Sequence, residues 1–352
     1  MILVTGGSGF IGSNFILRWL GHNAEPVINL DKLTYAGNQS NLDSLVGDER
    51  YLFRLGDICD AGVVNHIFSE FKPRAVINFA AESHVDRSIE DSSSFIQTNI
   101  VGTHCLLECA RNYFESLNVE DRDDFRLVHV STDEVYGTLN VLDDPFTEQN
   151  QYKPNSPYSA SKAGSDHLVR AYHHTFGLPV ITTNCSNNYG AYQYPEKLIP
   201  LCIQRALGDA EIPIFGDGSQ IRDWLYVGDH CDAIEKVLLR GGLGEVYNIG
   251  GWNEKTNLDV VNIICEVLDK LAPREDGVSY KRQIKFVTDR PGHDKRYAVN
   301  SNKILSQLDW EPAETFESGL LKTIKWYLAN EIWISKIKQR QIKVESEDLL
   351  GS

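Results

Sequence analysis

Short aliphatic runs alternate with stretches of helical periodicity along the first half of this chain. The runs are near-continuous blocks of Val, Ile and Leu, which is typical of strands buried on both faces of a parallel sheet. Because each crossover between parallel strands places a helix on one face of the sheet, the pattern predicts an α/β fold with a doubly wound parallel sheet. The expected strands are Ile2–Thr5, Pro26–Asp31, Tyr51–Asp57, Ala75–Ala80, Arg126–Ser131 and Val180–Asn184. Helical spacing is clearest at Phe10–Leu20, Thr98–Phe114 and Pro157–Phe176.

The pattern loosens after residue 190, where turns rich in Gly, Pro and Asp separate shorter elements. The strand-like pieces and helical stretches there are Ile212–Phe215, Glu245–Ile249 and Ile284–Val287, and Pro195–Leu207, Val227–Arg240 and Leu258–Leu271. We therefore predict a first domain over residues 1–190, a smaller mixed α/β region over 191–330 that interleaves with it in part, and a frayed C-terminal tail over 331–352.

The bulk composition argues against several classes of protein. A formal net charge of −15 repels phosphate backbones and anionic lipid, so we expect neither a nucleic-acid partner nor a membrane surface. No run of about 18 apolar residues occurs, and the first residues lack the basic stretch and apolar block of a secretory signal. The seven cysteines are scattered, with no Cys-x-x-Cys and no zinc-like spacing. A reduced, cytoplasmic protein without a metal site is the simplest interpretation.

A glycine-rich turn stands between the first expected strand and the first helix, with glycines at Gly6, Gly9 and Gly12. Such a turn lets the backbone approach a pyrophosphate closely, and the amides at the helix N-terminus bind anions. Glycine clusters also form plain turns, so the position between strand and helix carries the argument. Asp31, which ends the second strand, can accept hydrogen bonds from ribose hydroxyls and would repel a 2′-phosphate. Together these features predict a Rossmann-type site for NAD, with further contacts from Asp57, Ile58, Ala80, Ala81 and Ser83.

Tyr158 and Lys162 form a Tyr-x-x-x-Lys pair, which occurs once in the chain. Pro157 suits a first helical position and Ser156 suits a cap, so the two side chains fall one turn apart on the same helix face. A nearby ammonium favours phenolate over phenol and would make Tyr158 a usable base. A helix-surface pair without a function is the alternative.

Two adjacent carboxylates, Asp133 and Glu134, follow the fifth expected strand and Thr132. Burying them at the mouth of a sheet is costly unless they act on a ligand. Neighbouring side chains of an extended strand point to opposite faces, so a turn must follow the strand if both are to reach one ligand.

These features together resemble the extended short-chain dehydrogenase/reductase superfamily. Within it, the Asp133-Glu134 pair is similar to the dTDP-glucose 4,6-dehydratases, whereas the sugar-nucleotide epimerases lack it. The similarity extends over nearly the whole chain, with Ala191 as a departure where the family usually has Pro. The runs that carry it are Asp31–Asn38, Ala81–Ser88, Asn187–Gly190, Pro195–Pro200 and Arg290–Asp294.

The resemblance implies conversion of dTDP-glucose to dTDP-4-keto-6-deoxyglucose and water. Tyr158, assisted by Thr132, would remove the 4-hydroxyl proton while NAD+ accepts hydride from C4, and Lys162 would hold the nicotinamide ribose. Glu134 would then take the C5 proton while Asp133 protonates the departing 6-hydroxyl, before hydride returns to C6. The cofactor contacts that the resemblance adds are Phe10, Ile11, Lys32, Thr34, Gly37 and Thr98.

A nucleotide diphosphate carries charge that an acidic protein has to neutralise locally. Arg222 and Arg290 are the candidates, because a guanidinium grips two phosphate oxygens at once. A surface ion pair with Asp223 is the alternative for Arg222. The resemblance adds, as substrate contacts, Ser83, His84, Asn187, Glu196, Lys197, Leu198, Asn257 and His293. Solvated helix surface is the alternative for Lys197, and loop capping for the two histidines.

The sequence leaves alternatives open for both the partner and the function of this chain. In the superfamily, the helices equivalent to 98–114 and 157–176 form a dimer interface, and a homodimer is permitted here by apolar spacing at Cys105, Leu106, Cys109, Leu168 and Tyr172. The other functions are a 4-epimerase or dehydratase of the same superfamily acting on a CDP-, GDP- or UDP-sugar, and a non-catalytic NAD-binding sensor. Asp133-Glu134 argues against the epimerase, and intact catalytic side chains argue against the sensor. The residues alone do not select thymine over another base.

Overall fold

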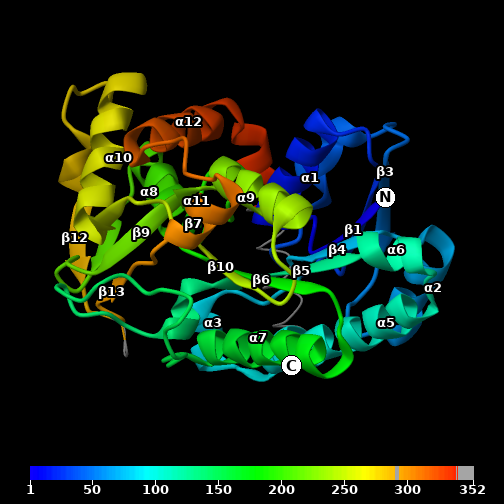
Figure 1. Ribbon diagram of the computed structural model, residues 1–352. Coiled ribbons are helices and arrows are strands. Elements are labelled where there is room, and N and C mark those ends of the chain that lie inside the picture. Colours follow the sequence, from blue (N-terminus) through cyan, green and yellow to red (C-terminus); the bar gives the residue numbers. More distant parts are fainter. Residues whose placement is uncertain (290–292, 338, 340–352) are drawn as a thin grey trace.

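A parallel sheet of seven strands forms the centre of the molecule, in a computed structural model that describes residues 1–289, 293–337 and 339 (Figure 1). Its strand order is β10-β6-β5-β4-β1-β2-β3, and every neighbouring pair is parallel. The predicted doubly wound sheet is therefore confirmed. The strands are Ile2–Thr5 (β1), Val27–Asp31 (β2), Tyr51–Leu55 (β3), Ala75–Asn78 (β4), Arg126–Thr132 (β5), Val180–Cys185 (β6) and Val246–Ile249 (β10).

Helices cover both faces of this sheet (Figure 1). Each layer packs its apolar stripe against the fully buried Val, Ile and Leu side chains of the strands, so the core lies in two slabs on either side of the sheet. One layer contains α2 (Ala61–Phe71), α5 (Thr103–Ser116) and α7 (Pro157–Phe176). The other contains α1 (Phe10–His22), α9 (Val227–Arg240) and α11 (Asn302–Leu308).

Several apolar side chains that the sequence suggested for a dimer interface pack against the sheet instead. Leu106, Cys109 and Tyr172 are buried in the slab between the sheet and the helices α5 and α7. These side chains therefore belong to the core and are not available to a partner.

Local sequence signals set the limits of α7, which agree with the predicted helix. The Ser156 hydroxyl accepts a hydrogen bond from the Ser159 N–H at 3.1 Å, and the Ser159 hydroxyl accepts one from the Ser156 N–H at 3.0 Å. This reciprocal capping box, with Pro157 at the first helical position, starts the helix. Gly177, at φ +69°, ends it in the left-handed conformation that glycine adopts readily.

The start of the helix expected at 98–114 differs from the prediction. A π-helical segment, Ile96–Gly102, precedes α5 and continues directly into it. Short π segments occur often at functional sites, because the wider turn reorients the side chains within it.

The second region lies at one end of the sheet (Figure 1). Strand β9 (Ile221–Tyr226) pairs with β7 (Asn187–Tyr189), β11 (Glu254–Thr256) and β13 (Arg296–Tyr297), and β8 (Ile212–Phe215) pairs with β12 (Ile284–Val287). Three helices pack on these strands: α8 (Leu198–Leu207), α10 (Asn257–Leu271) and α12 (Phe316–Ala329). Because β10 pairs with β6, this part of the chain also completes the main sheet.

The chain after α12 is helical and packed beyond residue 331, where the sequence predicted a frayed tail. Residues 331–337 are helical, and Trp333 and Ile337 are buried among the aromatic side chains of the second region. Trp333 Nε1 donates to Asn41 Oδ1 at 2.8 Å, which joins this segment to the first domain. The sequence interpretation followed the many Lys, Gln and Glu residues and overlooked the apolar positions between them.

Short elements complete the description. They are Gln39–Leu45 (η1), Val85–Glu90 (α3), Ser93–Phe95 (α4), Val119–Asp124 (α6), Asp133–Tyr136 (η3) and Tyr280–Gln283 (η4). Over the described ranges, no helix is long and apolar enough to cross a membrane.

Candidate active site

The glycine-rich turn joins β1 to α1 at the carboxyl edge of the sheet. Gly6 has φ +68°, and a Cβ at this position would lie 2.6 Å from the backbone nitrogen of Ala80. A Cβ on Gly12 would lie 2.4 Å from the carbonyl oxygen of Gly6. Gly9 supplies no side-chain cap to α1, and the first turn carries no acidic residue. The turn therefore leaves an uncapped helix N-terminus and a close backbone approach, as a pyrophosphate requires.

The ends of β2 and β3 form the next wall of the site. Asp31 accepts hydrogen bonds from the N–H of Ser8 at 2.9 Å and from the N–H of Leu33 at 2.7 Å, which hold its carboxylate beside the glycine turn. Lys32 Nζ lies 2.7 Å from Asp57 Oδ2, so an ion pair links the two strand ends.

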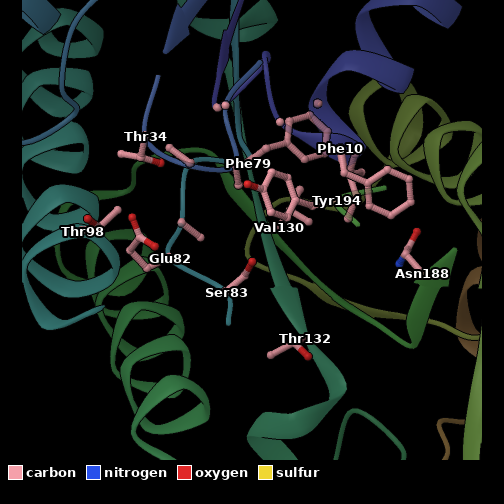
Figure 2. A pocket seen from close by; sticks show the side chains of 18 of the residues that line it. Phe10, Thr34, Phe79, Glu82, Ser83, Thr98, Val130, Thr132, Asn188 and Tyr194 are labelled. Atoms are coloured by element: carbon pink, nitrogen blue, oxygen red, sulfur yellow. The ribbon is translucent and has the colours of Figure 1, made fainter. Parts of the chain in front are cut away.

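One pocket at this edge contains every residue predicted to bind the cofactor and every residue predicted to be catalytic. Figure 2 shows Thr34 and Thr98 on one side of it, Tyr194 and Asn188 on the other, and Thr132 at the end of β5. The predicted residues that line the pocket are Gly6, Gly9, Phe10, Ile11, Gly12, Asp31, Lys32, Thr34, Gly37, Asp57, Ile58, Ala80, Ala81, Ser83, Thr98, Thr132, Asp133, Glu134, Tyr158 and Lys162.

A 3₁₀ turn at the end of β5 brings the two adjacent carboxylates into the pocket. The turn Asp133–Tyr136 starts where Thr132 Oγ1 accepts the N–H of Glu134 at 3.3 Å. Asp133 is 2% exposed, and its Oδ2 has no hydrogen-bond partner within the described chain. Burial raises the pKa of Asp133 well above its usual range, and repulsion from Glu134 and Asp223 adds to the rise. A raised pKa favours the protonated form of Asp133, which is the form that can donate a proton.

Tyr158 faces this pair from the start of α7. Burial raises the pKa of Tyr158 well above its usual range, Glu134 raises it further, and a hydrogen bond with Thr132 opposes the rise. Burial also lowers the pKa of Lys162, whose Nζ donates to the carbonyl oxygen of Val130 at 2.9 Å. We expected the Lys162 ammonium to favour the phenolate, and burial and the charge of Glu134 act in the opposite direction.

Only part of the predicted substrate set lines this pocket. Ser83, Asn187, Glu196 and Lys197 do so. His84 caps α3, where its Nδ1 accepts the N–H of Arg87, and its Nε2 lies 3.5 Å from Glu196 Oε1. The remaining described candidates lie outside the pocket lining, and Arg290 falls outside the described residues: Leu198 and Asn257 begin α8 and α10, and His293 Nδ1 lies 2.7 Å from Asp289 Oδ1.

Arg222 is buried and does not pair with its neighbour Asp223. Its guanidinium stacks on the Tyr297 ring at 4.4 Å and donates to the Asp294 carbonyl at 3.0 Å. Asp223 instead accepts from the Ser186 hydroxyl at 2.7 Å. The positive charge of Arg222 acts on Asp133 and partly offsets the rise of its pKa, so the guanidinium lies toward the catalytic end.

Several residues of the site escaped sequence analysis. Asn99, in the π-helical segment, donates to the Glu82 carbonyl at 3.0 Å and to the Ser161 hydroxyl at 2.8 Å, and accepts the Glu82 N–H at 2.9 Å. It therefore ties the pocket loop after β4 to α7, and no sequence signal places it there. Further lining residues that we did not predict are Tyr35, Phe79, Glu82, Cys185, Asn188, Gln193 and Tyr194. Tyr35 and Glu82 lie inside motifs that the sequence analysis used.

Comparison with known proteins identifies relatives over most of the chain. Residues 3–323 match the family model described as GDP-mannose 4,6 dehydratase. A dTDP-glucose 4,6-dehydratase of Xanthomonas campestris pv. campestris is 56% identical over 343 residues, which cover 97% of each chain. The crystal structure of dTDP-glucose 4,6-dehydratase from Bacillus anthracis in complex with NAD has a TM-score of 0.84 at 47% identity, covering 96% of this chain and 99% of that one. A UDP-glucose 4-epimerase of Thermotoga maritima has a TM-score of 0.82 at 28% identity, covering 93% and 98%.

Substitution of Gly12 by Ala should weaken binding of the predicted NAD at least about tenfold, which corresponds to about 1.4 kcal/mol. The added methyl group would collide with backbone atoms of the glycine turn, which cannot move without widening the cradle. Gly21→Ala is the matched control on the same helix, because a Cβ there meets nothing within 4 Å. The NAD content of the purified proteins, read beside circular dichroism spectra, would contradict the assignment if both variants retained NAD equally.

Proposed function

This chain belongs to the dTDP-glucose 4,6-dehydratase family of the extended short-chain dehydrogenase/reductases, and we propose that it converts dTDP-glucose to dTDP-4-keto-6-deoxyglucose and water. The observation that carries the proposal is the buried carboxyl group of Asp133 beside Glu134, in one pocket with Tyr158 and the glycine cradle. An epimerase of the same fold needs the cradle and the tyrosine, whereas an elimination also needs an acid and a base.

NAD fits the residues of the cradle. Gly6, Gly9 and Gly12 would hold its pyrophosphate against the α1 N-terminus, and Asp31 would accept the hydroxyls of the adenosine ribose. NAD+ bound there would supply a hydride acceptor for C4 and, once reduced, a donor of the same hydride to C6, so the reaction involves no net oxidation.

The side chains of the pocket would carry the proton transfers. Tyr158, hydrogen-bonded to Thr132, accepts the proton of the 4-hydroxyl, and Lys162 binds the nicotinamide ribose. A ketone at C4 makes the C5 proton acidic, and Glu134 removes it and returns a proton to C5 when hydride reaches C6. Asp133 gives its proton to the departing 6-hydroxyl, which then leaves as water.

The nucleotide end of the substrate would extend from this pocket toward the second region. Asn187, Glu196 and Lys197 lie at the boundary between the two, where Lys197 Nζ donates to the Ser83 carbonyl at 3.2 Å. Beyond them, Arg222 supplies a buried guanidinium near the catalytic end. The further contacts proposed for the diphosphate and nucleoside are Leu198, Asn257, Arg290 and His293, and for the sugar Ser83 and His84.

The reaction is tested by incubating the purified protein with dTDP-glucose, without added cofactor, and measuring the mass of the product by mass spectrometry. CDP-glucose, UDP-glucose and GDP-mannose run in parallel. Loss of one water from dTDP-glucose alone is the expected result, because the cofactor is regenerated in each cycle and has no need to leave. Turnover of a different nucleotide sugar would overturn the proposed substrate, and no water loss even with added NAD+ would overturn the reaction.

Glu134→Gln should preserve C4 oxidation and stop elimination, since the amide cannot accept the C5 proton. The readouts are reduced-cofactor absorbance in a single turnover and exchange of deuterium at C5. Tyr158→Phe is the contrasting variant, because it should block the oxidation that precedes elimination. Wild-type rates of deuterium exchange at C5 in the Glu134→Gln protein would contradict its role as base.

We infer that the protein is a homodimer that associates through the face formed by α3, the π-helical segment and α7. We also infer a cytoplasmic location. Exposed apolar side chains on these elements are Ile89, Ile96, Val101 and Phe176, and exposed apolar surface is a mark of interaction sites. A reducing compartment agrees with seven free cysteines.

Light scattering should give about twice the 39.7 kDa of one chain. Val101→Glu should shift the mass toward one chain, because a carboxylate at a closed interface loses its hydration. Leu142→Glu, at a solvated position in a turn outside these elements, is the control and should leave the mass unchanged. A monomeric wild-type protein would end the proposal.

A further inference from the structure

A buried carboxylate, Asp166, lies on α7 one turn beyond Lys162 and two turns beyond Tyr158. Residues four apart on a helix share a face, so these three side chains follow one line toward the sheet. Asp166 is 4% exposed. Removing a carboxylate from water costs free energy unless charges and donors around it compensate.

Asp166 and Lys162 together hold three consecutive residues of β5. His129 Nε2 lies 3.3 Å from Asp166 Oδ1, the Val130 carbonyl accepts Lys162 Nζ at 2.9 Å, and the Ser131 hydroxyl donates to Asp166 Oδ2 at 2.8 Å. The residues that follow in the chain are Thr132, Asp133 and Glu134. These contacts therefore fix α7, which carries Tyr158, relative to β5, which leads into Asp133 and Glu134.

Burial acts against a charge on the other titratable groups that face Asp166 and Lys162 around this corner. Burial lowers the pKa of the His129 imidazole, and repulsion from Lys162 lowers it further. Burial raises the pKa of the thiol and phenols that reach the corner from β6, the 3₁₀ turn and the loop before α7: Cys185, Tyr136 and Tyr152. Asp166 therefore supplies the negative charge that opposes the effect of burial on Lys162.

On the basis of the function proposed above, we propose that Asp166 is a positioning residue of the reaction: its carboxylate keeps the buried Lys162 side chain cationic beside Tyr158 and holds α7 in register with β5. Its side chain is not among those that line the pocket. A phenol in this environment becomes a base only while a cation remains next to it, so Asp166 acts on the chemistry through Lys162.

Asp166→Asn tests the charge with little change of shape, because the amide oxygen can still accept from His129 Nε2 and the amide NH2 can donate to the Ser131 hydroxyl, which can also act as an acceptor. Without the carboxylate, the ammonium of Lys162 loses its proton at lower pH, so the alkaline limb of the kcat profile should move down by about 1–3 pH units. Tyr158 loses its cationic support, so the acid limb should move up. We expect a kcat at neutral pH at least about tenfold lower, with a smaller change in KM.

Two further variants separate charge from structure. Ser131→Ala removes a hydrogen bond from Asp166 and keeps the charge, so its pH limits should match those of the wild type. Asp166→Glu keeps the charge with altered geometry and should retain the wild-type limits even where kcat falls. Lower activity with unchanged pH limits in Asp166→Asn would reduce Asp166 to a packing role and overturn the proposal.

A direct titration tests the proposal without substrate or turnover. The Nζ resonance of Lys162 in the wild-type protein, assigned by its loss in Lys162→Met, should report a cationic ammonium throughout the neutral range. An uncharged Lys162 at neutral pH would overturn the proposal even if the Asp166 variants did not fold. Because this readout is independent of catalysis, failure of the inference remains distinguishable from failure of the proposed dehydration.

Discussion

At the carboxyl end of β5, the side chains of Asp133, Lys162 and Asp166 are almost completely removed from water, so each loses its hydration if it carries a charge. Loss of hydration is the largest cause of the raised pKa of Asp133 and of the lowered pKa of Lys162. The same effect that favours the protonated form of Asp133, which an acid needs, also favours the uncharged form of Lys162. One buried environment can therefore hold an acid and a cation only because Asp166 is placed beside the lysine.

The parallel sheet decides which residues meet in that environment. Every strand of the main sheet ends at the same edge, so segments far apart in sequence reach one pocket from β1, β2, β3, β4, β5 and β6. The glycine turn contributes backbone alone, and a side chain at Gly6 or Gly12 would collide with the chain around it. The binding half of the pocket is therefore built from close backbone approach, and the catalytic half from buried ionisable side chains.

Interleaving of the two regions gives the pocket its second wall. Strand β10 completes the main sheet, and β7 leads from β6 to the small sheet that contains Arg222. The same exchange of segments brings Trp333 onto Asn41, so the end of the described chain supports the loop that follows Asp31. A ligand that reaches from the cradle to Arg222 would thus touch both regions without crossing a flexible linker.

Sequence alone determined the features that depend on local pattern. These are the strands Ile2–Thr5 and Ile212–Phe215, the limits of α7 between the cap Ser156 and Gly177, and the glycine turn. The sequence also identified the cofactor and catalytic residues that line one pocket. Capping, proline and glycine effects act within a few residues, so they can be read without a fold. Tertiary structure alone decided that Asn99 bonds to Ser161 and that Arg222 stacks on Tyr297. It also decided the burial of Trp333 and the raised pKa of Tyr158. Each of these depends on how completely distant segments exclude water from one another, and the linear order of residues does not contain that quantity.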